Sequence, residues 1–172
     1  MLFLISYTIS PVITSVTNKI SVPVPEVFNI GNNEFTYTDA KAICMSVGSR
    51  LATYEELEDA YKHGAEWCKY GWTEGQMALF PTQKETWNYL QKNTKKKHHC
   101  GRPGINGGYI KNPNTLYSAN CFGIKPSNPN FVPNTDRFAS AESTDPKVEY
   151  WKKHKNDLSI SPYNPDTWSS IQ

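Results

Sequence analysis

Residues 35–57 read FTYTDAKAICMSVGSRLATYEEL and contain the beginnings of two helices. The first begins at Thr36, which is followed three residues later by Asp39 in a pattern that resembles a capping box with Asp in place of Glu. Apolar and small side chains then recur at helical spacing until Gly48, a residue type that commonly ends helices. The stretch therefore predicts a first helix over about residues 37–47.

A second capping box follows a short apolar link in the same stretch. Thr53 lies three residues before Glu56, an arrangement in which each side chain satisfies a backbone N–H at the start of a helix. Gly64 is the expected end of this second helix. Its apolar face would comprise Leu57, Ala60 and Tyr61.

The flanking sequence predicts short strands and two extended arms. From Trp67 onward, closely spaced glycines and prolines divide the chain into short strands and turns, so an α+β domain is expected. Residues 1–26 are rich in Val, Ile, Ser, Thr and Pro, which favours an extended arm, and their apolar start is a weak candidate for a signal or anchor segment. Six of the twelve prolines fall in residues 124–172, which favours a Pro-rich C-terminal arm.

Length and composition limit the class of protein. The chain has 172 residues, of which 38% are hydrophobic and 13% aromatic, and this suits one globular domain with flanking arms. No apolar run in the sequence approaches the roughly 20 residues that a membrane-spanning helix needs. The formal net charge of +2 does not indicate a protein that binds nucleic acid specifically.

Charge is distributed unevenly along the chain. Residues 26–85 carry five basic and ten acidic side chains, whereas residues 86–135 carry seven basic side chains and no acidic one. A block of one sign attracts anions such as phosphates, acidic protein surfaces, or sulfated and carboxylated sugars. The alternative is a solvated lysine loop without a ligand.

The chain contains four cysteines, Cys44, Cys68, Cys100 and Cys121. An even number of thiols spread over one compact stretch is typical of two disulfides. A structural zinc site is one alternative, but such sites usually bring their ligands in close pairs such as Cys-x-x-Cys, which this sequence lacks. Four reduced, buried cysteines in a cytosolic protein are the other alternative.

Several further segments occur together, in one order, over about residues 27–123. They are residues 35–44 and 48–57, Cys68 followed by Gly71-Trp72, then Phe80-Pro81, Cys100-Gly101, Pro103-Gly104-Ile105, and Tyr117 before Cys121-Phe122. This succession resembles the Link module, the hyaluronan-binding domain of cell-surface and extracellular-matrix proteins. Both arms lie outside the resemblance.

The resemblance implies an α+β fold of two helices and two small antiparallel sheets, related to C-type lectin-like domains. It implies two disulfides, Cys44 with Cys121 and Cys68 with Cys100. It also implies binding without catalysis and without a cofactor. In such a module aromatic faces stack on sugar rings in a shallow groove, while basic groups pair with the sugar carboxylates.

The ligand-contacting positions of the family are carried over one at a time. They assign the groove to Phe80, Arg102, Tyr109 and Lys111, with Tyr54 as a further contact. The chain departs from the family pattern at two places. Asn32 and Asn33 stand where binders have a basic residue and a tyrosine, and Gly108 stands where a tyrosine is expected, with Tyr109 displaced by one position.

The segment between Cys68 and Cys100 is longer than in compact members of the family, and the extra length falls near residues 92–99. It contains a basic run, Lys95, Lys96, Lys97, His98 and His99. In the functional interpretation this run adds positive charge beside the groove and extends binding to polyanions. In the alternative it is a mobile surface loop.

These observations predict a non-enzymatic glycan-binding module for hyaluronan or another glycosaminoglycan or polyanion, in an extracellular or other oxidising compartment. The alternative is a structural subunit of a larger assembly, for example a virus particle, which docks on neighbouring proteins through residues 1–26 and 124–172. The sequence contains no Gly-x-Ser-x-Gly elbow, phosphate loop or His-Glu-x-x-His pair, so neither catalysis nor a metal site is expected.

Overall fold

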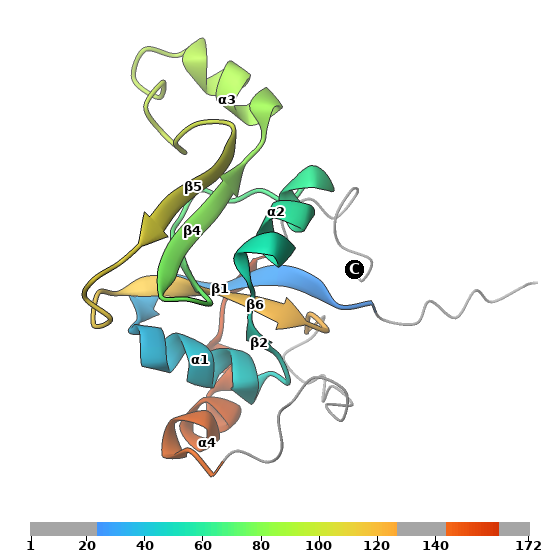
Figure 1. Ribbon diagram of the computed structural model, residues 1–172, viewed down its shortest axis with the longest axis vertical. Helices are drawn as coiled ribbons and strands as arrows, with labels where there is room; N and C mark the ends of the chain where they lie inside the picture. The colour runs from blue at the N-terminus through green and yellow to red at the C-terminus, as the bar shows by residue number, and fades with distance from the viewer. Residues whose placement is uncertain (1–23, 127–143, 162–172) are drawn as a thin grey trace, which may run out of the picture.

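The structure is a computed structural model that describes residues 24–126 and 144–161. The expectations for the rest of both arms lie outside the described residues. Helices cover both sides of a central sheet, and the polypeptide crosses from one side to the other between α1 and α2 (Figure 1). The helices are α1 (Tyr37–Ser46), α2 (Tyr54–Lys62), α3 (Lys84–Gln91) and α4 (Pro146–Lys153), with a short 3-10 helix at Lys155–Asp157.

The strands form one mixed sheet in the order β5-β4-β3-β6-β1-β7, with β2 also paired to β6. All pairs are antiparallel except β3 and β6, which run parallel and pair at two positions. The strands are β1 (Glu26–Phe35), β2 (Arg50–Leu51), β3 (Gly71–Thr73), β4 (Met77–Thr82), β5 (Gly104–Tyr109), β6 (Tyr117–Gly123) and β7 (Ile160–Ser161).

The predicted α+β class is confirmed, but the two separate sheets expected from the resemblance are joined into one. Their junction is the parallel contact between β3 and β6, in which Gly71 pairs with Ser118 and Trp72 pairs with Ala119. A pairing between residues so far apart in the chain leaves no local pattern in the sequence, so it was not predictable from periodicity.

A buried amide reinforces this short junction. Asn120 on β6 donates from Nδ2 to the Gly71 carbonyl at 3.0 Å and to the Leu79 carbonyl at 2.9 Å. Its Oδ1 accepts from Asn29 Nδ2 on β1 at 2.8 Å. Gly71 must be a glycine because a Cβ at this position would overlap the Asn120 side chain. One side chain therefore connects β1, β6, β3 and β4.

Both predicted helices begin where the capping signals lie. Thr36 Oγ1 accepts from the Asp39 backbone N–H at 3.2 Å, and Thr53 forms a complete capping box with Glu56. The interpretation of these residues as helix starts is confirmed. Of the three residues expected on the inner face of α2, Leu57 and Ala60 are buried and Tyr61 is half-buried.

Alternation along β1 explains how α1 and α2 come to cover opposite faces of the sheet. Phe28 belongs to the same apolar cluster as Ile43 of α1, whereas its neighbour Val27 belongs to the cluster that contains Leu57 of α2. Successive side chains of a strand point to opposite faces, so one strand contributes to both clusters. In Figure 1 the two helices accordingly lie on opposite sides of β1 and β6.

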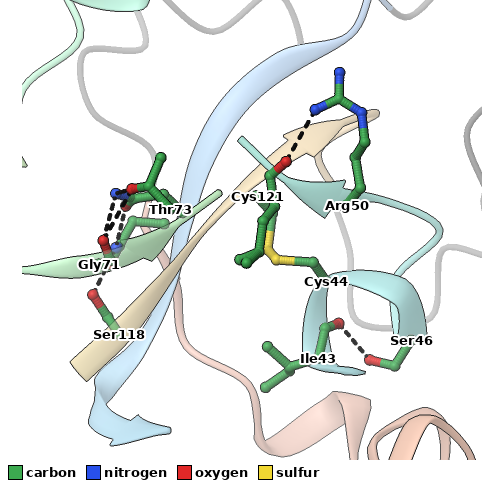
Figure 2. Close-up of a disulfide and its surroundings, with 11 residues drawn as sticks. Ile43, Cys44, Ser46, Arg50, Gly71, Thr73, Ser118 and Cys121 are labelled. Atoms are coloured by element: carbon green, nitrogen blue, oxygen red, sulfur yellow. Dashed lines mark hydrogen bonds between the residues drawn. A yellow bond between two sulfur atoms is a disulfide. The ribbon is translucent and has the colours of Figure 1, made fainter. Parts of the chain in front are cut away.

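The two disulfides have the pairing that the resemblance implied. Cys44 of α1 is bonded to Cys121 of β6, with Cα atoms 5.4 Å apart, and Figure 2 shows this bond crossing from the helix to the strand. Cys68 is bonded to Cys100, with Cα atoms 4.8 Å apart, and connects the start of β3 to the turn before β5. All four cysteines are thus used in disulfides, which excludes the zinc and reduced-thiol alternatives.

Helix α3 differs from the expectation that only strands and turns follow Trp67. Its N-cap residue, Gln83, makes no side-chain capping hydrogen bond, and Leu90 is its one buried residue. The helix therefore lacks the start signal that α1 and α2 share. It lies beyond the ends of β4 and β5, far from α1 and α4 (Figure 1).

The C-terminal arm also differs from the extended segment that its proline content predicts. Residues 144–161 fold back onto the domain, where α4 packs against α1 and β7 pairs with β1. Val148 is 1% exposed, and the Trp151 ring packs edge-on against Phe35 with centroids 5.3 Å apart. Pro146 stands at the start of α4, a position at which proline favours a helix.

No helix within the two described ranges is long and apolar enough to cross a bilayer.

We expect Trp151→Ala to lower the free energy of unfolding by about 1–3 kcal/mol, because it removes the half-buried ring that packs on Phe35. Lys153→Ala, in the same helix and on an exposed side chain, is the control and should change stability little. Urea denaturation of the full chain measures both values. Equal stability of the two variants would contradict the packing of α4 on the domain.

An ion pair between Lys147 of α4 and Asp39 of α1 also holds the arm in place. Burial by itself would raise the pKa of Asp39, but hydrogen bonds from Lys147 and Thr36 outweigh burial and lower this pKa below its ordinary value of 3.8. A carboxylate of this kind stabilises the fold above its ordinary pKa, and the contribution is lost as pH falls through the lowered value.

Asp39→Asn should therefore lower the free energy of unfolding by about 0.5–1 kcal/mol at roughly pH 7, the size typical of a partly exposed pair. The difference from the wild type should shrink below about pH 4, because the unfolded carboxylate takes up a proton near its ordinary pKa while the native carboxylate stays charged to lower pH. Denaturation curves at neutral and acidic pH test this. A difference that stays constant over the whole range would show that the Asp39 charge contributes nothing.

Candidate functional site

Five aromatic rings form a continuous row from β4 to α1. Neighbouring centroids along this aromatic row are 4.8, 5.6, 5.2 and 5.3 Å apart, and its members in order are Phe80, Tyr70, Tyr117, Trp72 and Tyr37. Trp72, the fourth ring, is fully buried and donates from Nε1 to the Phe35 carbonyl at 2.9 Å, which anchors the row to the core. Tyr70, the second ring, is 41% exposed.

Phe80, the aromatic residue that sequence reasoning assigned to the groove, offers little surface to a ligand. It is only 6% exposed and packs edge-on under the Tyr70 ring. The exposed aromatic surface at this position belongs to Tyr70, which sequence reasoning did not single out. Its position directly before the Gly71-Trp72 landmark was the only available signal.

The strand beside Tyr70, β5, contains two adjacent glycines. Gly107 has φ +115°, and a Cβ there would overlap the Ala78 carbonyl and come within 3.1 Å of Tyr70 Cε1. A Cβ at Gly108 would meet no atom within 4 Å, so the space above this residue is open. Tyr70 therefore stands next to a stretch of bare backbone.

A cation lies beside the same tyrosine. Lys69 Nζ donates to the Gly31 carbonyl at 2.8 Å, and burial lowers the pKa of Lys69. Gly31 directly precedes Asn32 and Asn33, the two positions at which the chain lacks the basic residue and the tyrosine of the family pattern. Lys69, in the segment that precedes β3, thus brings a cation to the residue next to this place.

Tyr109 and Lys111 are held together at the end of β5. The Gln76 side chain donates to the Ile110 carbonyl at 2.8 Å, and its Nε2 lies 3.4 Å from the Tyr109 hydroxyl and 3.5 Å from the Lys111 carbonyl. Tyr109 is 67% exposed. It pairs with Met77 while Gly108 pairs with Ala78, so the two neighbouring positions point to opposite faces of β5. A tyrosine displaced by one residue does not replace the expected one.

Arg102 lies in a separate place, on the turn that leads into β5. Its backbone N–H donates to Asn106 Oδ1 at 2.9 Å, and its carbonyl accepts from Asn106 Nδ2 at 2.7 Å. The exposed Arg102 side chain lines a pocket between this turn and α3. Tyr54, the last of the predicted contacts, is the first residue of α2 and is 39% exposed.

The basic run of residues 95–99 is fully exposed on the loop that follows α3. Lys97 and His98 line the same pocket as Arg102, whereas the neighbouring residues Lys95, Lys96 and His99 do not. Hydrogen bonds from the Lys96 and Lys97 N–H groups to the Asn93 carbonyl, both 2.9 Å, give the loop a turn structure.

Most of the predicted residues therefore fall into three groups: Phe80 beneath Tyr70, Tyr109 with Lys111, and Arg102 with Lys97 and His98. Tyr54 on α2 and the exposed Lys95, Lys96 and His99 belong to none of them. Within the described parts of the chain, no cluster of three or more His, Cys, Asp or Glu side chains could hold a metal ion. The arrangement is suited to stacking and to pairing with anions.

Comparison with protein families gives one match over more than half of the chain. Residues 26–122 match the family described as the extracellular link domain. The match begins at the first residue of β1 and ends within β6, so it contains both disulfides and all the residues discussed above.

Proposed function

The chain belongs to the extracellular link domain family, and from this premise we propose that it binds an acidic polysaccharide, hyaluronan or another glycosaminoglycan, without catalysing a reaction. The family is in general one of hyaluronan- and glycosaminoglycan-binding modules. The observation that carries the proposal for this chain is the exposed Tyr70 ring beside the bare backbone of Gly107 and Gly108.

A sugar ring has an apolar C–H face and a rim of hydroxyls, so it needs an aromatic platform with hydrogen-bonding groups around it. Tyr70 offers such a platform. Its ring is fixed in orientation by contacts with the rings of Phe80 and Tyr117. At Gly108, where a Cβ would meet no atom within 4 Å, the missing side chain leaves room for a second sugar ring along β5. We assign the stacking role to Tyr70 rather than to Phe80.

Positive charge accompanies this platform. The sequence between Trp87 and Lys125 contains no Asp or Glu, and the exposed cations Arg102 and Lys111 stand at the two ends of β5. A polymer with regularly repeated carboxylates can contact both ends at once, whereas a single small anion cannot. The attraction between exposed charges is screened by salt, so affinity should fall as ionic strength rises.

The two disulfides and the family agree on an extracellular or other oxidising compartment. Nothing in residues 24–126 and 144–161 favours the alternative of a structural subunit in a larger assembly. Residues 144–161, the described part of the C-terminal arm, contact the chain's own β1 and α1.

Tyr70→Ala should weaken the binding of hyaluronan oligosaccharides to the full chain roughly tenfold, because it removes the proposed stacking surface. Tyr70→Phe keeps the ring and should bind within about twofold of the wild type. Tyr89→Ala, which removes a 69% exposed tyrosine from α3, is the matched control and should bind normally. Isothermal titration calorimetry measures the affinities.

Near-ultraviolet circular dichroism must first show that Tyr70→Ala is folded, since this change uncovers Phe80. A folded Tyr70→Ala variant with unchanged affinity would refute the stacking role. Absence of binding by the folded wild type to both hyaluronan and heparin would refute the proposed function itself.

The double variant Arg102→Ala/Lys111→Ala should bind both polysaccharides roughly tenfold or more weakly at low salt, with a shallower dependence of affinity on salt concentration. Lys92→Ala/Lys153→Ala removes the same number of charges from exposed positions elsewhere and should retain the wild-type salt dependence. If the two double variants behave alike, binding responds to net charge only and not to these two residues.

A further inference from the structure

A pocket of about 410 Å³ lies between α3 and the turn that contains the second cysteine of the Cys68–Cys100 disulfide. Its lining residues are Trp87, Gln91, Lys97, His98, Gly101, Arg102 and Pro103. A volume of this size falls within the range of pockets that bind small ligands. The aromatic row lies elsewhere, since none of its five rings lines this pocket.

Hydrogen bonds fix the backbone on both sides of the pocket. On the α3 side, Gln91 Nε2 donates to the Lys97 carbonyl at 2.9 Å and holds the loop against the helix. On the other side, the Asn106 side chain bonds both the N–H and the carbonyl of Arg102, at 2.9 and 2.7 Å. The disulfide at Cys100 secures the end of the loop. These contacts fix the backbone on both sides of the pocket.

The titratable side chains that line the pocket are all basic. Lys97, His98 and Arg102 contribute basic groups, and no acidic residue lines it. Within residues 24–126 and 144–161, the ion pairs that the structure contains all involve other basic side chains. The nearest acidic residue in the sequence is Glu85, in the first turn of α3. Arg102 offers the planar, two-pronged donor that matches a carboxylate or sulfate group.

Trp87 distinguishes this pocket from a simple patch of lysines. Its half-buried indole contributes an apolar surface and one N–H donor to a wall that is otherwise basic and polar. An inorganic anion would use only the cations. An acidic sugar would use both, with its C–H face on the indole and its anionic group on Arg102 and Lys97.

We propose that this pocket is a second subsite for the same polysaccharide, which takes a sugar residue through its carboxylate or sulfate group. The subsite deepens the proposed function and rests on it. It is built by α3 and by the basic run, which lies in the stretch near residues 92–99 where the resemblance to the family places extra length. The subsite gives a role to Lys97 and His98, which line the pocket. It gives none to Lys95, Lys96 and His99, which do not line it.

The test is the double variant Trp87→Ala/Lys97→Gln, titrated as full chain with hyaluronan and with heparin oligosaccharides of equal length. The matched control is Tyr89→Ala/Lys95→Gln, which removes one aromatic ring and one positive charge from the same segment outside the pocket. Arg102 is left unchanged because it also belongs to the site proposed above. Thermal unfolding checks that both variants are folded.

We expect Trp87→Ala/Lys97→Gln to weaken binding about tenfold while the control stays within about twofold of the wild type. A loss with both ligands identifies a carboxylate as the bound group, and a loss with heparin alone identifies a sulfate. Equal affinities of the two double variants overturn the subsite.

Failure of the subsite can be told apart from failure of the proposed function. If only the subsite is wrong, Tyr70→Ala still weakens binding and Trp87→Ala/Lys97→Gln does not. If the proposed function is wrong, the wild type itself binds neither polysaccharide. Should Trp87→Ala prove unstable, Trp87→Leu with Lys97→Gln keeps an apolar side chain in the wall and removes only the aromatic face.

Discussion

The fold depends on the side-chain amide of Asn120. Strand β3 is only three residues long and meets β6 at two positions, so the backbone ladder between the two halves of the sheet is weak. Asn120 bonds to the backbone of β3 and β4 on one side and to Asn29 of β1 on the other. In a buried setting each of these bonds is costly to lose, because no water replaces it. On the next residue, Cys121 attaches α1 to the same strand.

This construction leaves the antiparallel pair of β4 and β5 free to present a surface. Ala78 and Leu79 of β4 anchor the pair to the core, while its outer strand, β5, carries two glycines and no bulky side chain between Asn106 and Tyr109. At its far end the Cys68–Cys100 disulfide supports α3 and the basic loop. The docked α4 lies at the opposite end of the molecule from α3 (Figure 1). The proposed subsite beside α3 is therefore far from the place where the C-terminal arm packs on the domain.

Sequence reasoning worked best where a signal is local. The caps at Thr36 and Thr53 act over three residues, and each sets a helix start that the structure confirms. It failed where the decisive contact is distant. Helix α3 has no capping side chain, and α4 is stable because Val148 and Trp151 find a surface on α1 and β1 that lies far away in the sequence. Propensity alone cannot supply such a partner.

By itself the sequence determined the α+β class and the two helix starts, and its order of landmarks identified the family from which the disulfide pairing followed. Only the tertiary structure decided which aromatic ring is exposed. Phe80 and Tyr70 are both aromatic and both close to a landmark, but packing buries the first beneath the second. Likewise, only the pairing register shows which residues Gly108 and Tyr109 stand opposite, namely Ala78 and Met77 of β4. Whether a side chain is exposed, and which residues it stands opposite in a sheet, depends on the elements that pack or pair with it. Those elements lie far away in the sequence, so the sequence pattern around a residue does not identify them.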